Sequence, residues 1–150
     1  MAELRPILLV EDSPRDVELT LAALAKCQLA NEVVVVRDGA EALDYLYSKG
    51  AFAEREPGEP AVVLLDLKLP KVDGLEVLET VKKDPDQRHI PIVMLTSSRE
   101  EQDLVKSYSL GVNAFVVKPV DFRAFFEAIQ DLGVFWGIVN EPPPRSANGG

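Results

Sequence analysis

The chain has 150 residues, of which 47% are hydrophobic and 27% charged, and its formal net charge is −9. This length predicts one domain with a single core, and the acidic balance argues against nonspecific binding to nucleic acid or to anionic membranes. The apolar runs are too short to span a bilayer, no signal peptide is visible, and the single cysteine, Cys27, excludes an internal disulfide, so we expect a cytoplasmic protein.

A strand and a helix are the first predicted elements. Residues 7–10 are all apolar, which is typical of a strand buried on both faces of a parallel sheet. Ser13 and Pro14 then suit the N-cap and the first position of a helix, and apolar residues at helical spacing continue it to Cys27. Cys27 is expected to be a small buried thiol without a chemical role.

The same alternation of strand and helix repeats along the rest of the chain. Further strands are predicted at four apolar runs: 33–36, 61–65, 91–95 and 114–117. Further helices are predicted to begin at Asp38-Gly39, Asp73-Gly74, Ser98 and Asp121. The third of these is expected to run to 110–111, and the fourth to 132 with an extension toward Trp136. Residues 50–60 mix Gly, Pro and Glu and predict an exposed loop.

Five βα units in a row predict an α/β fold with a doubly wound parallel sheet. Right-handed crossovers place helices on both faces of such a sheet. Five strands suit the flavodoxin-like (βα)5 order 2-1-3-4-5, with a crevice between the first and third strands. We expect residues 1–140 to form the domain and residues 141–150, which are rich in Pro and Gly, to form a disordered tail.

Polar residues directly follow four of the apolar runs in the sequence. Glu11 and Asp12 follow the first run, Asp66 the third, Thr96 the fourth and Lys118 the fifth. Because the carboxyl ends of parallel strands meet at one edge of the sheet, we expect these side chains to converge there.

Three carboxylates in one crevice would raise one another's pKa unless a cation neutralises them. Mg²⁺ suits this set, because it takes oxygen ligands and retains waters and phosphate oxygens. We expect Asp12 and Asp66 to be direct ligands and Glu11 to act through water. The backbone carbonyl of Lys68 is a further candidate ligand.

This inventory suits the transfer of a phosphoryl group onto a carboxylate. Asp66 is the predicted nucleophile and phosphoacceptor, forming an acyl phosphate. Lys118 offers a point charge to one phosphoryl oxygen, and Thr96 offers a hydroxyl donor to another. No separate general base is required, because the carboxylate is already ionised.

Taken together, the residues resemble the receiver domain of two-component response regulators. Glu11-Asp12, Asp66, Thr96 and Lys118-Pro119 match that family's motif, with spacings of 30 and 22 residues between the last three positions. The resemblance covers about residues 7–132. Several further segments look more narrowly like standalone receivers paired with bacterial phytochrome histidine kinases. They are Leu43-Asp44-Tyr45-Leu46, the loop after it, Lys71-Val72-Asp73-Gly74 and the aromatic pairs 125–126 and 135–136.

The resemblance implies a signalling protein rather than an enzyme with a separate substrate. A phosphohistidine of a sensor histidine kinase would donate to Asp66, and the domain would catalyse its own phosphorylation and dephosphorylation. The Thr96 hydroxyl would move toward the phosphate and Phe115 would rotate inward as a switch. Phe115 replaces the commoner tyrosine, so a hydroxyl contact to a partner is lost. Pro119 is expected to follow a cis peptide bond.

The resemblance also bears on partners. No DNA-binding module is expected after residue 132, so the output is expected to be protein contact or phosphate relay. We expect a homodimer through the helix after Ser98, the strand at 114–117 and the last helix. Four aromatic side chains supply apolar area there: Phe122, Phe126, Phe135 and Trp136.

Other interpretations remain open from the residues alone. Asp66, Thr96 or Lys118 taken singly could be a turn residue, a helix cap or a solvated lysine. A phosphatase with an aspartyl nucleophile usually carries a second aspartate two residues on, where this chain has Lys68. A flavin or dinucleotide binder would want a glycine-rich loop after the first strand, where this chain has two acids. A degenerate receiver used only for binding is the third alternative.

Overall fold

The computed structural model describes residues 5–27, 29, 31–55, 58–112 and 114–132. Its five strands are β1 (Ile7–Val10), β2 (Val33–Val36), β3 (Val62–Asp66), β4 (Ile92–Thr96) and β5 (Phe115–Val117). Its helices are α1 (Pro14–Lys26), α2 (Gly39–Leu46), α3 (Gly74–Lys83), α4 (Arg99–Ser107) and α5 (Phe122–Leu132), with a short 3₁₀ helix, η1 (Gly50–Phe52). Within the described ranges, no helix has both the length and the apolar character needed to cross a bilayer.

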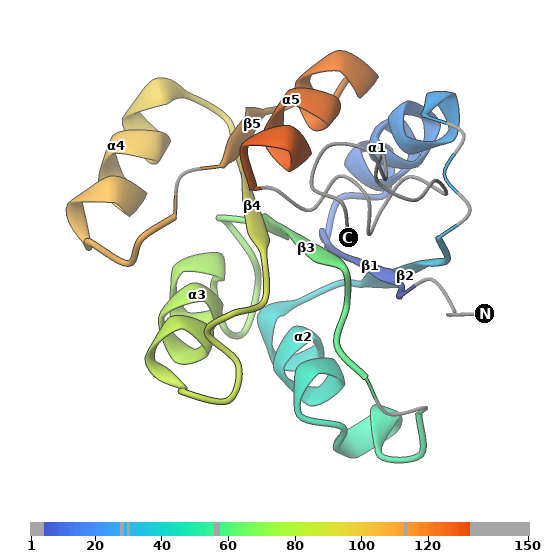
Figure 1. Ribbon diagram of the computed structural model, residues 1–150, viewed down its shortest axis with the longest axis vertical. Helices are drawn as coiled ribbons and strands as arrows, with labels where there is room; N and C mark the ends of the chain where they lie inside the picture. The colour runs from blue at the N-terminus through green and yellow to red at the C-terminus, as the bar shows by residue number, and fades with distance from the viewer. Residues whose placement is uncertain (1–4, 28, 30, 56–57, 113, 133–150) are drawn as a thin grey trace, which may run out of the picture.

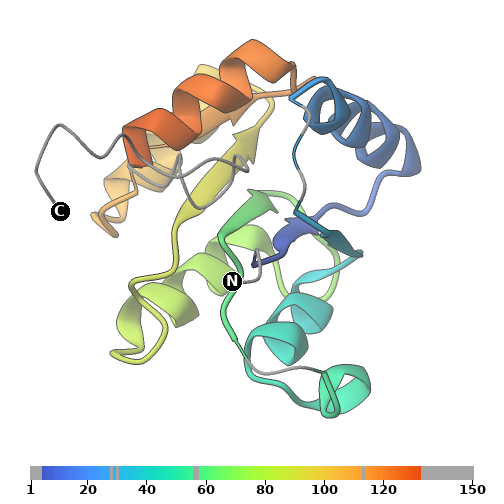
Figure 2. The same ribbon diagram turned by 45° about the vertical axis from the view of Figure 1, so that its right-hand side comes forward.

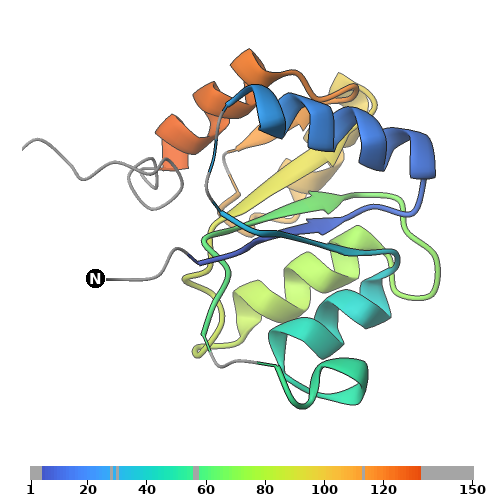
Figure 3. The same ribbon diagram turned by 90° about the vertical axis from the view of Figure 1, so that its right-hand side faces the viewer.

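The five strands form one parallel sheet in the order β2-β1-β3-β4-β5, which confirms the predicted flavodoxin-like fold. Helices α1 and α5 cover one face, and α2, α3 and α4 cover the other (Figures 1 and 2). Figure 3 shows the sheet edge-on between these two layers, with the ends of the central strands gathered at one side.

Both faces of the central strands are buried, as a doubly covered parallel sheet requires. Ile7 and Leu9 of β1 pack toward α1 and α5, while Leu8 and Val10 pack toward the opposite layer. All of β3, including its last residue, Asp66, is buried. The acid therefore sits at the end of a rigid, water-excluded strand and not in a mobile loop.

Helix starts agree with the sequence predictions, because each has its expected cap. Ser13, Asp38, Asp73 and Ser98 each accept a hydrogen bond from the backbone three residues on, at 3.3, 2.8, 2.9 and 3.3 Å. Asp121 does the same for the N–H of Ala124 at 2.8 Å. Such caps satisfy backbone donors that have no partner inside the helix.

Several element ends were predicted wrongly. Helix α4 stops at Ser107 and not at 110–111, because Ser109 and Gly111 take positive φ angles of 54° and 79° and turn the chain away. The loop at 50–60 contains η1, whose Phe52 ring packs edge-on against Tyr45 at 5.1 Å. The strands β3 and β4 include Asp66 and Thr96 as their last residues. Phe135, Trp136 and the predicted tail lie outside the described residues.

Candidate functional site

Three acids meet at the carboxyl end of β1 and β3. Glu11 and Asp12 directly follow β1. The strand β3 pairs with β1 in the sheet and ends with Asp66. One carboxylate oxygen from each lies within 4.8 Å of the others. Glu11 and Asp66 are buried and Asp12 is exposed, so the cluster reaches from the protein interior to the solvent.

Lys118, just after β5, brings an ammonium group to these acids. Its Nζ lies 3.1 Å from Asp66 Oδ2 and 3.5 Å from Glu11 Oε1. The Lys118 side chain is 16% exposed. The peptide bond to Pro119 is cis, as the family resemblance implied.

Asp16 completes the set of carboxylates around Lys118, and the sequence analysis missed it. Its Oδ2 lies 3.2 Å from Lys118 Nζ, and its side chain is 29% exposed. Asp16 lies in the first turn of α1, three residues after the N-cap Ser13, and this position close behind the end of β1 was the available signal.

The crowding of acids changes the proton affinity of Glu11 and Lys118. Burial, followed by a hydrogen bond to Asp66 and the charge of Asp66, raises the pKa of Glu11 to about 8. Burial alone would lower the pKa of Lys118, but the charges of Asp66 and Glu11 outweigh it and raise that pKa above its usual range. One ammonium therefore does not neutralise the cluster fully.

The backbone around Asp66 is closely packed. The N–H of Lys68 donates to Asp66 Oδ1 at 3.3 Å, and the N–H of Gly74 donates to the Leu67 carbonyl at 2.9 Å. A Cβ on Gly74 would lie 2.1 Å from the carbonyl oxygen of Asp66, so only glycine fits there. The loop after β3 is thus held in place by α3.

Thr96 ends β4, the next strand along the sheet. The residue is fully buried, and its Oγ1 has no hydrogen-bond partner within the described part of the chain. Its carbonyl accepts the N–H of Lys118 at 2.8 Å, which ties the two residues together through the backbone. A buried hydroxyl without a partner is unfavourable unless a ligand satisfies it.

Two other predicted residues lie apart from the acidic cluster. Phe115 stands at the opposite end of β5, half-buried, with Lys106 Nζ 5.3 Å from the centre of its ring. The Lys68 side chain turns outward and pairs with Glu101 on α4 at 3.2 Å. The backbone N–H of Lys68 is the group that contacts the acidic cluster, through Asp66 Oδ1.

The donor set fits a hard divalent cation. Three carboxylate oxygens within 4.8 Å are the ligand type that Mg²⁺ and Mn²⁺ prefer. The exposed position of Asp12 leaves room for water and for a phosphate oxygen at the same ion.

Comparison with known proteins gives a consistent result. Residues 7–130 match the family model of the response regulator receiver domain. The chain is 41% identical over 130 residues to response regulator Rcp1 of Synechocystis sp., covering 87% of each chain. It matches the structure of the bacteriophytochrome response regulator AtBRR with 76% identity and a TM-score of 0.89, covering 93% of this chain and 100% of that one. The Mn²⁺-bound form of Rcp1 matches with 38% identity and a TM-score of 0.71, covering 93% and 99%.

Proposed function

Since this chain belongs to the response regulator receiver domain family, we propose that Asp66 accepts a phosphoryl group from a phosphohistidine of a sensor histidine kinase, with Mg²⁺ as cofactor. The observation that carries the proposal is the position of Asp66, a buried acid 3.1 Å from the Lys118 ammonium and grouped with Glu11 and Asp12.

In the proposed site, Asp12, Asp66 and the carbonyl of Lys68 hold the cation, and Glu11 orients a water beside it. When bound, the cation supplies positive charge that offsets the phosphoryl oxygens. The same ligand chemistry is supported by the manganese named in the Rcp1 structure.

The transfer forms one bond and breaks one. A carboxylate oxygen of Asp66 attacks the phosphorus, and the phosphorus–nitrogen bond of the phosphohistidine breaks, leaving its electron pair on the histidine nitrogen. Lys118 exchanges its contact with Asp66 for one with a phosphoryl oxygen, and the Thr96 hydroxyl donates to another. The same groups would assist the later attack of water on the acyl phosphate.

The switch is proposed to pass through Thr96 and Phe115. When the Thr96 hydroxyl gains a phosphoryl oxygen as acceptor, β4 and the start of α4 shift toward the site. The half-buried Phe115 ring then rotates inward, toward the space that the Thr96 side chain vacates.

The proposed donor is a kinase of the phytochrome type, supported by the bacteriophytochrome response regulator to which the chain is 76% identical. We place the protein in the cytoplasm, with residues 1–140 as the receiver domain and 141–150 as a tail.

We also propose a homodimer through α4, β5 and α5. Four large apolar side chains on these elements or directly after them are 39–48% exposed: Leu104, Tyr108, Val117 and Phe122. Size-exclusion chromatography that gives only a monomer at high concentration, with and without a phosphoryl analogue, would remove the dimer.

Phosphotransfer tests the central proposal. A phosphorylated histidine kinase should label the wild-type chain in Mg²⁺ buffer and lose that ability after chelation of the metal. Asp66→Asn should abolish labelling, because an amide is not a nucleophile toward phosphorus. Asp103→Asn, which changes an exposed acid of α4, is the control and should be labelled normally. Label on Asp66→Asn would move the acceptor elsewhere. A wild-type chain that no phosphodonor labels would be a binding module only.

A further inference from the structure

An ion pair joins the loop after β3 to the first turn of α4. Lys68 Nζ lies 3.2 Å from Glu101 Oε2, with the Lys68 side chain 79% exposed and the Glu101 side chain 13% exposed. The N–H of Lys68 contacts Asp66 Oδ1 at 3.3 Å, so this side chain starts beside the proposed acceptor. The pair therefore connects the acceptor loop with a different helix.

Glu101 also fixes the N-terminus of α4. Its Oε1 accepts the N–H of Ser97 at 2.7 Å, and its own N–H donates to Ser98 Oγ at 3.3 Å. Along its length α4 buries only Val105. Because so little apolar surface holds the helix, these polar contacts contribute strongly to the position of its first turn, which begins three residues after Thr96.

A phosphoryl group on Asp66 would compete for Lys68. It carries a charge of about −1.5 to −2, against the single charge of Glu101. Because the Lys68 side chain is 79% exposed, water and salt screen this ion pair, so the lysine can leave Glu101 readily. A cleft of about 500 Å³ separates the two segments and is lined by Asp12, Lys68 and Leu104 among others, which gives the lysine room to turn toward the site.

We propose that Lys68 and Glu101 form a latch that couples phosphorylation to α4. In the unphosphorylated protein Lys68 holds Glu101 and the first turn of α4. With a phosphoryl group on Asp66, Lys68 pairs with a phosphoryl oxygen and the first turn of α4 is released. Glu101 acts here as a positioning residue, and the latch rests on the proposed function, since it requires the phosphoryl group at Asp66.

Coupling of this kind is reciprocal, so breaking the latch should tighten binding at Asp66. The probe is beryllium trifluoride, a phosphoryl analogue, titrated in Mg²⁺ buffer and followed by ¹⁹F NMR. Glu101→Gln keeps an oxygen for the Ser97 N–H and loses the ion pair, and it should bind the analogue about two- to fivefold more tightly. In a Lys68→Gln background, Glu101→Gln should change the affinity by less than about 1.5-fold, because the lysine is gone.

A second readout follows α4 directly. Hydrogen exchange at the amides of α4 should be faster in the unphosphorylated Glu101→Gln and Lys68→Gln variants than in the wild type. The analogue should speed exchange in the wild type and add little in either variant. If Glu101→Gln is too unstable for titration, Lys68→Gln still tests the latch by hydrogen exchange. The Lys68 side chain is 79% exposed, so its replacement should leave the packing of the domain intact.

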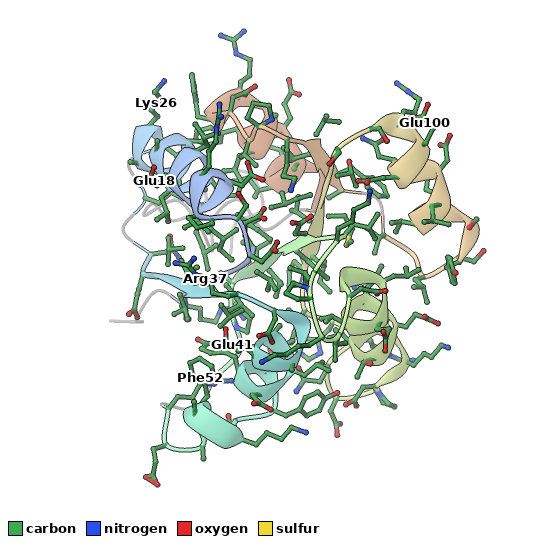
Figure 4. All side chains as sticks on the ribbon, turned by 180° about the vertical axis from the view of Figure 1, so that it is seen from behind. Glu18, Lys26, Arg37, Glu41, Phe52 and Glu100 are labelled. Atoms are coloured by element: carbon green, nitrogen blue, oxygen red, sulfur yellow. The ribbon has the colours of Figure 1, made fainter. Side chains whose placement is uncertain are left out.

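The matched control is Glu100→Gln. Glu100 is an exposed acid next to Glu101 at the start of α4 (Figure 4), so its replacement makes the same change in net charge. It should leave affinity within about 1.5-fold of the wild type, because exposed charges are screened at physiological salt. Equal affinities of Glu101→Gln and wild type, equal gains in Glu100→Gln and Glu101→Gln, or unchanged exchange in α4 would overturn the latch. A wild type that binds no analogue, or binds it as Asp66→Asn does, would instead overturn the proposed function.

Discussion

Helices α3 and α4 follow neighbouring strands and cover the same face of the sheet, yet they are anchored very differently (Figure 1). Of its ten residues, α3 buries Gly74, Val77, Leu78 and Val81, whereas α4 buries only Val105 of its nine. A buried aliphatic side chain contributes about 1.5–3 kcal/mol, so α3 is the more firmly held by several kcal/mol.

This difference separates two tasks at the site. Asp66 leads into a loop whose backbone the start of α3 holds in place at Gly74, so the proposed acceptor keeps its geometry. Thr96 leads into α4, which is held by the polar contacts at its N-terminus and whose Leu104 is 48% exposed. A weakly anchored element can change position at small energetic cost, and α4 is therefore the element that a phosphoryl group can redirect.

The largest effect is expected from matched leucine truncations in the two helices. Leu78→Ala in α3 should reduce the free energy of unfolding by about 2–5 kcal/mol, because the side chain is fully buried and leaves a cavity. Leu104→Ala in α4 should change it by no more than about 0.5 kcal/mol. Urea unfolding of both variants measures the contrast. A loss of similar size in the two helices would contradict the unequal anchoring.

Glycine substitutions test the same contrast at the site itself. Gly74→Ala should cost about 1–3 kcal/mol or more, because the added Cβ would lie 2.1 Å from the Asp66 carbonyl oxygen and must push the loop aside. It should also weaken Mg²⁺ binding several-fold by displacing Asp66 and Lys68. Calorimetry and urea unfolding give the two quantities.

Gly111→Ala is the control on the α4 side. Its φ of +79° makes alanine unfavourable by roughly 1–2 kcal/mol, yet among the described residues other than its two chain neighbours no heavy atom lies within 4 Å of the added Cβ. Stability should fall and Mg²⁺ affinity should remain. If both variants lose metal affinity in proportion to their lost stability, the close contact at Gly74 does not position the site.

Both the fold and the convergence of Glu11, Asp12, Asp66 and Lys118 at one edge of the sheet could be predicted from the sequence. Both depend on the regular alternation of apolar runs and helical segments. Short apolar runs define strands, and parallel strands bring their carboxyl ends to one edge whatever the details of packing. The roles assigned to these residues, and to Thr96 and Phe115, remain predictions.

Contacts between side chains of separate elements were not predictable in this way. The Asp16–Lys118 and Lys68–Glu101 pairs join residues 102 and 33 positions apart, and each depends on where a long side chain turns once the helices are packed. The early end of α4 depends on the local φ angles of Ser109 and Gly111. The weak anchoring of α4 did have a signal, because Leu104 and Val105 are its only aliphatic residues.

The smallest effect concerns the far end of α3. The hydroxyl of Tyr47, at the end of α2, donates to Asp84 Oδ2 at 2.5 Å, just past the end of α3, whereas Tyr108 at the end of α4 is 46% exposed. Tyr47→Phe should lower Tm at pH 7 by roughly 2–4 °C, the scale of one hydrogen bond in a domain of this size. Tyr108→Phe, the control, should leave Tm unchanged.

The pH dependence of that loss identifies its cause. The Tyr47 hydroxyl holds the pKa of Asp84 below its ordinary 3.8, so this contribution is present above pH 3.8 and is lost as the pH falls through the lower, folded value. Burial, then the hydrogen bond to Asp84, raises the pKa of Tyr47 from 10.0 to about 12, so stability is lost as the pH rises from 10 to 12. The Tm difference between wild type and Tyr47→Phe should therefore be largest between pH 5 and 9 and shrink on either side. A difference that stays constant from pH 3 to 11 would assign the loss of stability to packing. The hydrogen bond would then not distinguish the end of α3 from the end of α4.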